Sequence, residues 1–509
     1  MSNGFSKLPN EILDLILGRL NKHDWTMLTR CCQHLHNRIN PVLYQSIETP
    51  CYCIGIHKTL VYTLLTHPEL ARSVRSLKIG RLPYGADPKS YANHQHEHHD
   101  SLSSKPGLFQ LLQIPGSKSW KRRLSDIIQN LADRKWERTQ WIEDLQSGTH
   151  RDPWLAILLS LLPNLETIEL FWGGSGTRYS SWVLSKISQR CKPFDTRPFW
   201  TNLHTAIIKI PEDEGADTNF HRLIPFFILP SIRTFKGQLL TDKYLEPTLN
   251  IERSPLTNLE FIQCSSVLGF NYLIKICPNL HSFKYMQQED NCLHRSPGYN
   301  NIYFDTLRPT PLKDALATRK DTLQSVTVDV SRRSSNYGGF YSDDWIGCMN
   351  DFTQLRSLHI RAANFVGLGR SRRLDVNPSP RVPLVEFLPG CIEEVWISEV
   401  EDRILGTITG ELFGLVCSGE RFGKVRRIDV EGKNWLKGRV ENIGEEAWRK
   451  LYPDYGVLLR EDVLVATEEV RTACLRRGIE FHVRDMEVEV VFEEYDDVFL
   501  FVRGDDEED

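Results

Sequence analysis

The sequence contains few cysteines, and they are not spaced as metal ligands. Its 509 residues include 12 cysteines, far below the density of a scaffold held by disulfides. No Cys-x-x-Cys spacing occurs, although there is a Cys31-Cys32 pair and a Cys51-x-Cys53 pair. This spacing is not that of the common zinc sites. We therefore expect free thiols in a reducing compartment.

Long hydrophobic runs are also missing. The longest, near Trp154–Leu162 and Leu223–Leu229, fall far short of the roughly 18 residues that cross a bilayer. Near the N-terminus, Glu11, Asp14 and Arg19 interrupt the only apolar run, so we expect no signal peptide. The sequence predicts a soluble intracellular protein, cytoplasmic and/or nuclear, with no membrane partner.

Neither sign of charge dominates. Lys and Arg total 62 against 66 Asp and Glu, which gives a formal net charge of −4. Nucleic-acid-binding domains usually have a basic excess, so we expect no nucleic-acid partner. Hydrophobic residues make up 40% of the chain, enough for a large core. The length suggests about three domains or a single repeat array.

Catalytic signatures are absent from the sequence. Gly173-Gly174-Ser175-Gly176 lacks the spacing of a nucleophile elbow, and Gly367-Leu368-Gly369 lacks the third glycine of a dinucleotide site. There is no phosphate-binding P-loop motif, and His96-Glu97-His98-His99 does not match His-Glu-x-x-His. We expect a non-enzymatic protein with no cofactor. An enzyme whose site comes together only in three dimensions is the rival prediction.

Four histidines, His94, His96, His98 and His99, gather in the segment 93–100. Histidine is a common metal ligand. The tract nevertheless lies in a stretch rich in Ser, Pro and Gly with no cysteine nearby, which favours a solvated loop. We predict no metal site.

The first fifty residues have helical periodicity. Leu8-Pro9-Asn10-Glu11 opens a helix, because proline suits a first helical turn, and an apolar stripe follows. Asp24 is placed to cap a second helix, Pro41 to end it, and Val42-Leu43-Tyr44 to begin a third. Three short helices bury little surface alone. They therefore form either a cap on the next domain or a separate module.

The spacing Leu8-Pro9-x-Glu11-Ile12, followed by Trp25-x-x-Leu28 and Pro41-x-Leu43-Tyr44, resembles an F-box. The resemblance covers roughly residues 6–46. Trp25 stands where the family usually has leucine, and Cys32 where it often has serine. The resemblance implies docking on the Skp-type adaptor of cullin–RING ubiquitin ligases. It assigns the contact surface and its support to Leu8, Pro9, Ile12, Ile16, Leu28, Cys32, Leu35, Leu43 and Tyr44.

A phrase of the form Leu-x-x-hydrophobic-x-hydrophobic recurs through the rest of the chain. Clear copies begin at Leu165, Ile232, Leu259, Leu280, Leu323, Leu355, Ile392 and Val425. Weaker copies lie at Val74–Ile79, Leu203–Ile210 and Ile479–Val483. Helical patterns lie between them, at Trp154–Leu162, Ser180–Cys191, Leu268–Cys277, Pro311–Arg319, Asp344–Phe352, Pro383–Leu388 and Asp462–Arg477. Alternating strands and helices predict parallel strands with helical crossovers.

The phrases at Leu162-Pro163-Asn164-Leu165 and Cys277-Pro278-Asn279-Leu280 resemble a divergent leucine-rich repeat array. The usual Asn or Cys after the strand is mostly missing. An ordinary open α/β sheet is the alternative. The predicted fold class is α/β: a three-helix F-box followed by an irregular leucine-rich-repeat-like solenoid. The predicted domains are the F-box (1–48), a first repeat-like segment with the histidine-rich loop (49–118), the repeat domain (119–500) and an acidic tail (501–509).

In each phrase the first, fourth and sixth residues are predicted to face the core. The third and fifth then face the opposite, concave side, because strand side chains alternate. From this row we predict a substrate-binding set of Lys236, Phe261, Gln263, Lys284, His359, Trp396 and Arg427. The aromatic members Phe261 and Trp396 are either recognition anchors or pack beneath a long loop. Long segments that follow the strands are expected to add to this face.

The two resemblances together imply the substrate-recognition subunit of an SCF-type E3 ubiquitin ligase. Its partners would be the Skp-type adaptor, cullin through that adaptor, and an unknown protein substrate. The alternative is an F-box/repeat scaffold that acts outside a ubiquitin ligase.

Overall fold

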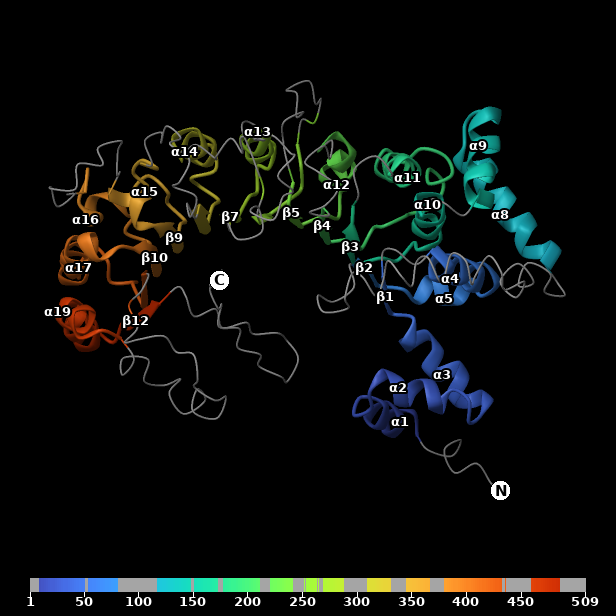
Figure 1. The fold of residues 1–509 in the computed structure, drawn as a ribbon, viewed down its shortest axis with the longest axis horizontal. Helices are drawn as coiled ribbons and strands as arrows, with labels where there is room; N and C mark the ends of the chain where they lie inside the picture. Colours follow the sequence, from blue (N-terminus) through green and yellow to red (C-terminus); the bar gives the residue numbers. More distant parts are fainter. Residues whose placement is uncertain are drawn as a thin grey trace, which may run out of the picture. The chain divides into compact units, whose positions relative to one another are not determined.

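The computed structural model places strands and helices in alternation along most of the chain. It describes residues 9–50, 54–80, 117–147, 151–172, 177–210, 220–240, 251, 253–262, 264, 269–287, 309–330, 345–366, 380–432, 435 and 459–485. The chain divides into two compact units, Met1–Tyr244 and Leu245–Asp509. Figure 1 labels the elements of both units.

The first unit begins with three helices and continues as strands alternating with helices. Its elements are α1 (Asn10–Leu17), α2 (Lys22–Leu28), α3 (Gln33–Leu43), β1 (Ser46–Pro50), α4 (Ile54–Thr66), α5 (Pro68–Ser73), β2 (Ser76–Gly80), α8 (Ser117–Leu131), α9 (Lys135–Ser147), α10 (Asp152–Leu161), β3 (Thr167–Phe171), α11 (Arg178–Ser188), β4 (Thr205–Lys209), the 3-10 helix η4 (Phe220–Leu223), α12 (Ile224–Ile228) and β5 (Thr234–Gln238).

The second unit follows the same alternation of strand and helix. Its elements are β6 (Asn258–Ile262), α13 (Gly269–Ile276), β7 (Ser282–Gln287), α14 (Pro309–Ala317), β8 (Ser325–Val330), β9 (Ser357–Arg361), α15 (Ala362–Val366), α16 (Leu384–Phe387), β10 (Glu394–Val400), α17 (Asp402–Cys417), β11 (Arg427–Gly432), α19 (Glu461–Arg477) and β12 (Glu480–Asp485).

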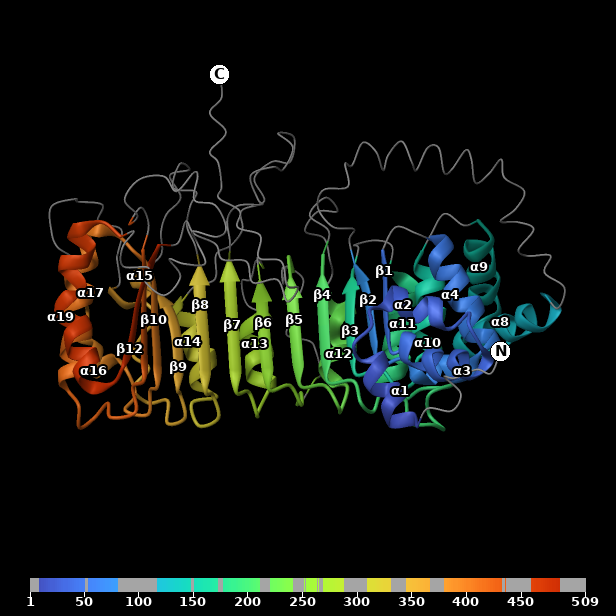
Figure 2. The ribbon, with the colours of Figure 1, turned by 90° about the horizontal axis from the view of Figure 1, so that it is seen from below.

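Within each unit, every strand pairs in parallel with the next strand in the sequence. Figure 2 shows the strands of each unit running side by side in one direction. The pairing begins one residue before each strand. The carbonyl oxygen of Gln324, for example, accepts the backbone N–H of Arg356 at 2.8 Å and that of Ser357 at 3.0 Å. The predicted α/β arrangement of parallel strands joined by helical connections is confirmed.

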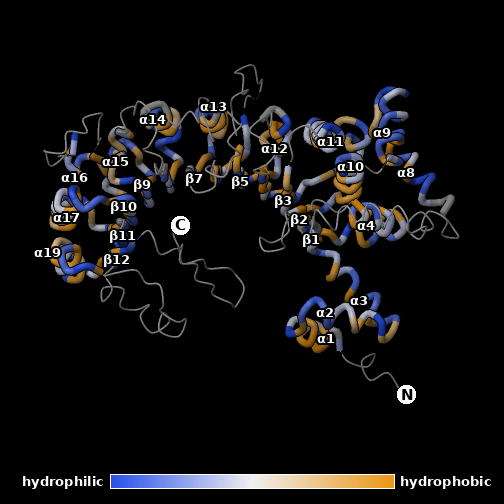
Figure 3. Tube along the Cα trace, in the orientation of Figure 1, coloured by the Kyte–Doolittle hydropathy of each residue, from blue (hydrophilic) through white to orange (hydrophobic). Residues whose placement is uncertain are grey.

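Burial alternates along most strands, as the phrase predicts. In β3, Ile168 and Leu170 are fully buried, whereas Thr167 and Glu169 are half-buried. Figure 1 shows that in the second unit the helices α13, α14, α17 and α19 lie on one side of the strands. The buried residues of the strands form the core with the apolar stretches of the helices, of which α10 is the most continuous in Figure 3. We call the opposite side of the strands the inner face.

The weak phrases also form strands. Val74–Ile79 contributes β2, Leu203–Ile210 contributes β4, and Ile479–Val483 contributes β12. Five of the predicted helices between strands match α10, α11, α13, α14 and α19 to within about three residues, and a sixth shortens to α16. Helix α17, with 16 residues, was not predicted.

Two local predictions about the repeats are wrong. No helix forms over the described residues 345–352, where Trp345, Ile346 and Phe352 instead pack as an irregular segment. In β6 the phrase begins at Leu256 rather than Leu259, so Phe261 is a core residue. Its ring stacks on Phe270 of α13, with centroids 3.9 Å apart.

The N-terminal helices differ from the prediction in their boundaries. Asn21, not Asp24, caps α2, because its side-chain oxygen accepts the backbone N–H of Asp24 at 3.0 Å. The backbone is not helical between Leu28 and Gln33. Helix α3 begins at Gln33 and continues through Pro41 to Leu43. The three helices share a small core made by Leu13, Leu17, Leu35 and Ile39.

Trp435 joins several elements at the C-terminal end of the second unit. Its side chain is fully buried. Its backbone N–H donates to Asp485 at 2.5 Å, and its indole N–H donates to Asp402 at 3.1 Å. The ring occupies the space beside Gly432, where a Cβ atom would lie 2.1 Å from the indole. Only glycine leaves room for the tryptophan here.

No helix in the described part of the chain has both the length and the apolar character to cross a membrane. The same residues contain no cluster of His, Cys, Asp and Glu that could hold a metal ion. The histidines at 94–99 lie outside the described residues, as do most of the long segments that follow the strands.

A buried carboxylate links two consecutive helices of the first unit. Asp152, in the first turn of α10, accepts the backbone N–H groups of Tyr179 at 2.5 Å and Ser180 at 3.1 Å, together with the Ser180 hydroxyl. These donors lie at the start of α11, where backbone N–H groups lack partners within the helix. Burial raises the pKa of Asp152 to about 6, and these hydrogen bonds oppose the rise.

We expect Asp152→Ala to destabilise the first unit by on the order of 2 kcal/mol, because buried N–H groups would lose their acceptor. Urea unfolding followed by circular dichroism measures the change. Glu143→Ala, at an exposed position of α9, is the control and should have little effect. Equal stability of the two variants would show that Asp152 contributes nothing as a cap.

Candidate functional site

The parallel register places one row of side chains along the middle of the inner face of the second unit. Each member is in register with its neighbour on the next strand. The row is Glu260, Lys284, Thr327, His359, Trp396, Asp429 and His482. The side chains of the row change along its length. Those on β6 and β7 form an ion pair, and those on β9 and β10 are aromatic.

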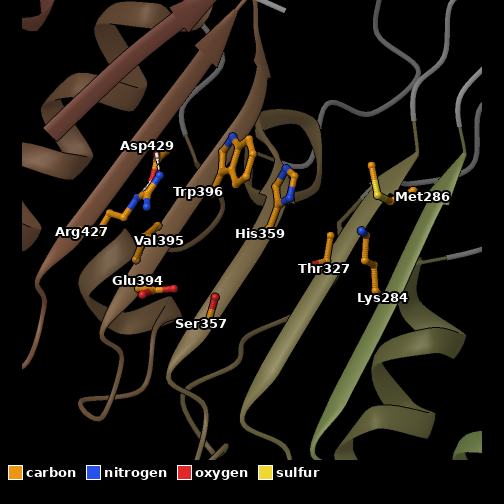
Figure 4. Close-up of a pocket in the computed structure, with 10 residues that line it drawn as sticks. All are labelled: Lys284, Met286, Thr327, Ser357, His359, Glu394, Val395, Trp396, Arg427 and Asp429. Atoms are coloured by element: carbon orange, nitrogen blue, oxygen red, sulfur yellow. Dashed lines mark hydrogen bonds and ion pairs between the residues drawn. The ribbon is translucent and has the colours of Figure 1, made fainter. Parts of the chain in front are cut away.

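A hollow of about 360 Å³ lies over the centre of this row, on β7 to β11. Figure 4 shows the side chains that line it. They are Lys284, Met286, Thr327, Ser357, His359, Glu394, Val395, Trp396, Arg427 and Asp429. The lining therefore combines cations, carboxylates and aromatic rings from five strands, as a surface for polar recognition would.

Two aromatic rings form the centre of the hollow. The rings of His359 and Trp396 stack, with centroids 4.2 Å apart and planes at 4°. The guanidinium of Arg484 lies 5.6 Å from the centroid of the Trp396 ring, a cation–π distance. The indole N–H of Trp396 donates to Glu431 at 3.2 Å. Trp396 is thus fixed by contacts from three neighbouring strands.

Ion pairs fix the cations of the inner face. Arg427 donates to both carboxylate oxygens of Asp429, at 2.6 and 3.1 Å, and Arg484 reaches the same carboxylate at 3.1 Å. Lys284 pairs with Glu260 at 2.8 Å. Asp429 is only 4% exposed, so two guanidinium groups compensate a buried charge.

His359 is held neutral by its surroundings. Burial lowers the pKa of His359 to about 4, the positive charge of Lys284 acts in the same direction, and Asp429 opposes it. The side chain is 9% exposed, and its Nε2 atom is buried without a hydrogen-bond partner. A neutral imidazole can accept a hydrogen bond at one ring nitrogen.

Two carboxylates at the border of the hollow have raised pKa values. Burial raises the pKa of Glu431 to about 7, and the negative charge of Asp329 adds to the effect. Burial also raises the pKa of Asp329 to about 6, with Glu399 adding to it and Arg361 and Lys284 opposing it. The Oδ1 atom of Asp329 is buried and accepts no hydrogen bond. Each carboxylate is therefore costly to keep ionised.

A family model described as a leucine-rich repeat domain matches residues 117–469. This is more than half of the 509 residues. The chain belongs to the leucine-rich repeat family. Leucine-rich repeat domains are typically non-catalytic modules of protein interaction, so the family indicates protein binding. No curated protein matches the chain.

The leucine-rich repeats bring four of the predicted substrate-binding residues together. Lys284, His359, Trp396 and Arg427 all line the hollow in the second unit. Lys236 lies on β5 in the first unit, half-buried on the inner face. Gln263 lies outside the described residues. The prediction for Phe261 is wrong, because the register of β6 turns it into the core.

Several residues of the site did not appear in the predicted set. Asp329, Glu431 and Arg484 each follow a member of the row by two residues. Each is the third residue of its strand that points to the inner face. The phrase was read only to its sixth residue, which excluded this position. Continuing the alternation one step along each strand would have found all three.

The residues predicted to contact an adaptor fall into two groups. Pro9 and Ile12 are exposed, and Ile16 and Tyr44 are half-buried. Leu35 is buried in the three-helix core, and Leu28, Cys32 and Leu43 pack against it. Leu8 lies outside the described residues. The second group therefore supports the helices from within, and the first lies at the surface.

Replacing Glu431 by glutamine should change how stability depends on pH. The folded pKa of Glu431, about 7, lies above the ordinary value of 4.5, so the parent loses stability as pH rises through this window. Glu431→Gln removes this loss and keeps an acceptor for Trp396. We expect the stability of the variant relative to the parent to increase by on the order of 2 kcal/mol between about pH 4.5 and pH 8.

Thermal unfolding across this pH range measures the difference. Glu468→Gln, at an exposed position of α19, removes the same charge and should shift stability equally at each pH. A pH-independent difference for Glu431→Gln as well would contradict the raised pKa.

Proposed function

We propose that the chain is the substrate-recognition subunit of an SCF-type E3 ubiquitin ligase. In this role the N-terminal helices bind the Skp-type adaptor, which joins them to cullin. The leucine-rich repeat domain binds a protein substrate. The observation that supports the proposal best is an exposed apolar surface on a three-helix module directly ahead of a repeat array.

The three helices use only part of their apolar residues for their own core. Leu13, Leu17, Leu35 and Ile39 are buried. In contrast, Ile12 is 44% exposed, Leu15 is 70% exposed and Met27 is 51% exposed. Exposed apolar side chains on a small helical module are typical of a surface that binds a partner helix or groove. The F-box resemblance of the segment that contains them, roughly residues 6–46, names that partner as the adaptor, although only Ile12 of the three belongs to the predicted contact set.

The connection between the helices and the first strands is short. Only Tyr44 and Gln45 separate α3 from β1, and α3 packs against α5 and β1. The carbonyl oxygen of Gln45 accepts the backbone N–H groups of Arg75 and Ser76, which begins the pairing with β2. An adaptor-bound helix would therefore hold the first repeats in a defined orientation. A receptor subunit contributes to ubiquitin transfer by proximity, which raises the effective concentration of substrate.

The test is a pull-down with a purified Skp-type adaptor. We expect the parent chain to bind and the double variant Ile12→Asp/Leu15→Asp to lose at least about tenfold in affinity, since charge would replace exposed apolar contacts. The matched control is Val465→Asp on α19, where the parent side chain is 70% exposed. It should bind as the parent does. Circular dichroism should show equal folding of all three proteins.

Two results would change the proposal. Failure of the parent chain to bind the adaptor would reduce the N-terminal helices to a cap on the repeat array. Binding of the adaptor without recruitment of cullin would favour a scaffold that acts outside a ubiquitin ligase.

A further inference from the structure

The inner face of the second unit has an uneven balance of ion pairs. Its arginines and Lys284 have anionic partners among the described residues: Lys284 with Glu260, Arg356 with Glu393, Arg361 with Glu399, Arg426 with Glu393 and Glu394, and Arg427 and Arg484 with Asp429. Asp329 and Glu431 form no ion pair with any described residue. The face therefore has two part-buried carboxylates without an ion-pair partner among the described residues.

Each carboxylate lies next to a residue that lines the hollow. Asp329 is in register with Met286, which lines the hollow, and Glu431 accepts the indole N–H of Trp396, which also lines it. The negative charge of Asp329 adds to the raised pKa of Glu431, whereas the hydrogen bond from Trp396 and the positive charge of Arg484 oppose the rise. A positive charge between the two carboxylates would oppose this effect and compensate their burial.

Two buried polar atoms at the hollow lack hydrogen-bond partners. The Nε2 atom of His359 and the Oδ1 atom of Asp329 are buried without hydrogen-bond partners. His359 is more than nine-tenths buried, lines the hollow and is neutral, and Figure 4 shows its side chain projecting from β9 toward the hollow. Buried polar atoms without partners are unusual in folded proteins. A ligand rich in N–H donors would satisfy them.

We propose that this hollow binds a basic side chain, an arginine or a lysine, presented by a protein substrate. Asp329 and Glu431 supply the negative charge, and His359 supplies a neutral acceptor. Trp396 positions the others, because it stacks on His359 and donates to Glu431. The identity of the occupant as part of a substrate rests on the proposed function of the repeat domain.

Other occupants fit less well. An acidic side chain would face uncompensated carboxylates, and the cations that could attract it are already paired. An aromatic side chain would have to compete for the Trp396 ring with His359, which stacks on it, and with Arg484, which lies 5.6 Å from its centroid. The guanidinium of Arg484 itself lies against Trp396 and Asp429, which shows that a cation is accommodated beside the hollow.

The test uses the full chain and three capped pentapeptides, Gly-Gly-X-Gly-Gly, with X as arginine, lysine or citrulline. Citrulline has the shape of arginine without its charge. Saturation-transfer NMR at low ionic strength detects weak binding. We expect the arginine or the lysine peptide to bind with a dissociation constant on the order of 1 mM and the citrulline peptide to bind at least about fivefold more weakly.

The double variant Asp329→Asn/Glu431→Gln should abolish this preference for charge. The matched control, Glu420→Gln/Glu468→Gln, removes two exposed carboxylates from the same unit and changes the net charge equally. It should retain the preference. Loss of the preference for a charged peptide in both double variants would mean that the peptides respond only to the net charge of the protein. That result would overturn the proposal.

Equal signals from all three peptides with the parent chain would also overturn it. The adaptor pull-down is independent of this experiment. If the parent chain binds the adaptor but shows no preference for a basic peptide, the hollow is not a basic-side-chain site and the proposed receptor role stands. If the parent chain prefers a basic peptide but does not bind the adaptor, the hollow is a basic-side-chain site and the proposed receptor role fails.

Discussion

The carbonyl oxygen immediately before each strand fixes the position of the next repeat. In most repeats it accepts two backbone N–H groups from the following phrase, as Arg356 does from Glu393 and Glu394. Because this bond recurs, consecutive strands start at the same level even though the connections between them differ greatly in length. The core leucines then stack in layers, and the side chains between them form straight rows on the inner face. The site depends on this constancy, since its members come from different repeats.

The rows also explain why charged residues on an open face become buried. Side chains on neighbouring parallel strands lie about 4.8 Å apart, so large groups in one row cover one another. His359, Trp396 and Asp429 occupy consecutive places in one row, and Asp429 is 4% exposed although it points away from the helices. Side chains on the inner face can thus be buried by their neighbours in the row, and this burial shifts their pKa values although they lie outside the main core. The unusual electrostatics of the hollow therefore follow from sequence choices at two positions on the inner face, that of His359 and the one two residues further along each strand.

Local spacing predicted much of the fold. Leu165, Ile168 and Leu170 have a pattern that only a strand facing a core explains, and the strands they predicted are present. The register of β6 could not be read locally, because both Leu256 and Leu259 fit the first place of the phrase. Pairing with β7 decides it, since Phe261 lies opposite Tyr285 in the core. The site was partly predictable for the same reason. Lys284, His359 and Trp396 follow from alternation, whereas the coupling of Asp329 to Glu431 arises between strands more than a hundred residues apart in sequence.

Trp435 gives the last repeats a dependence on distant sequence. Its indole fills the space beside Gly432, and its backbone N–H needs the carboxylate of Asp485, fifty positions further along. A frameshift or premature stop that removes Asp485 would therefore affect more than the final strand. It would leave the backbone N–H of this large aromatic residue without its acceptor, next to β11 and one strand away from Trp396. In genetic terms, alleles truncated late in the reading frame should disrupt the last repeats rather than behave as mild variants.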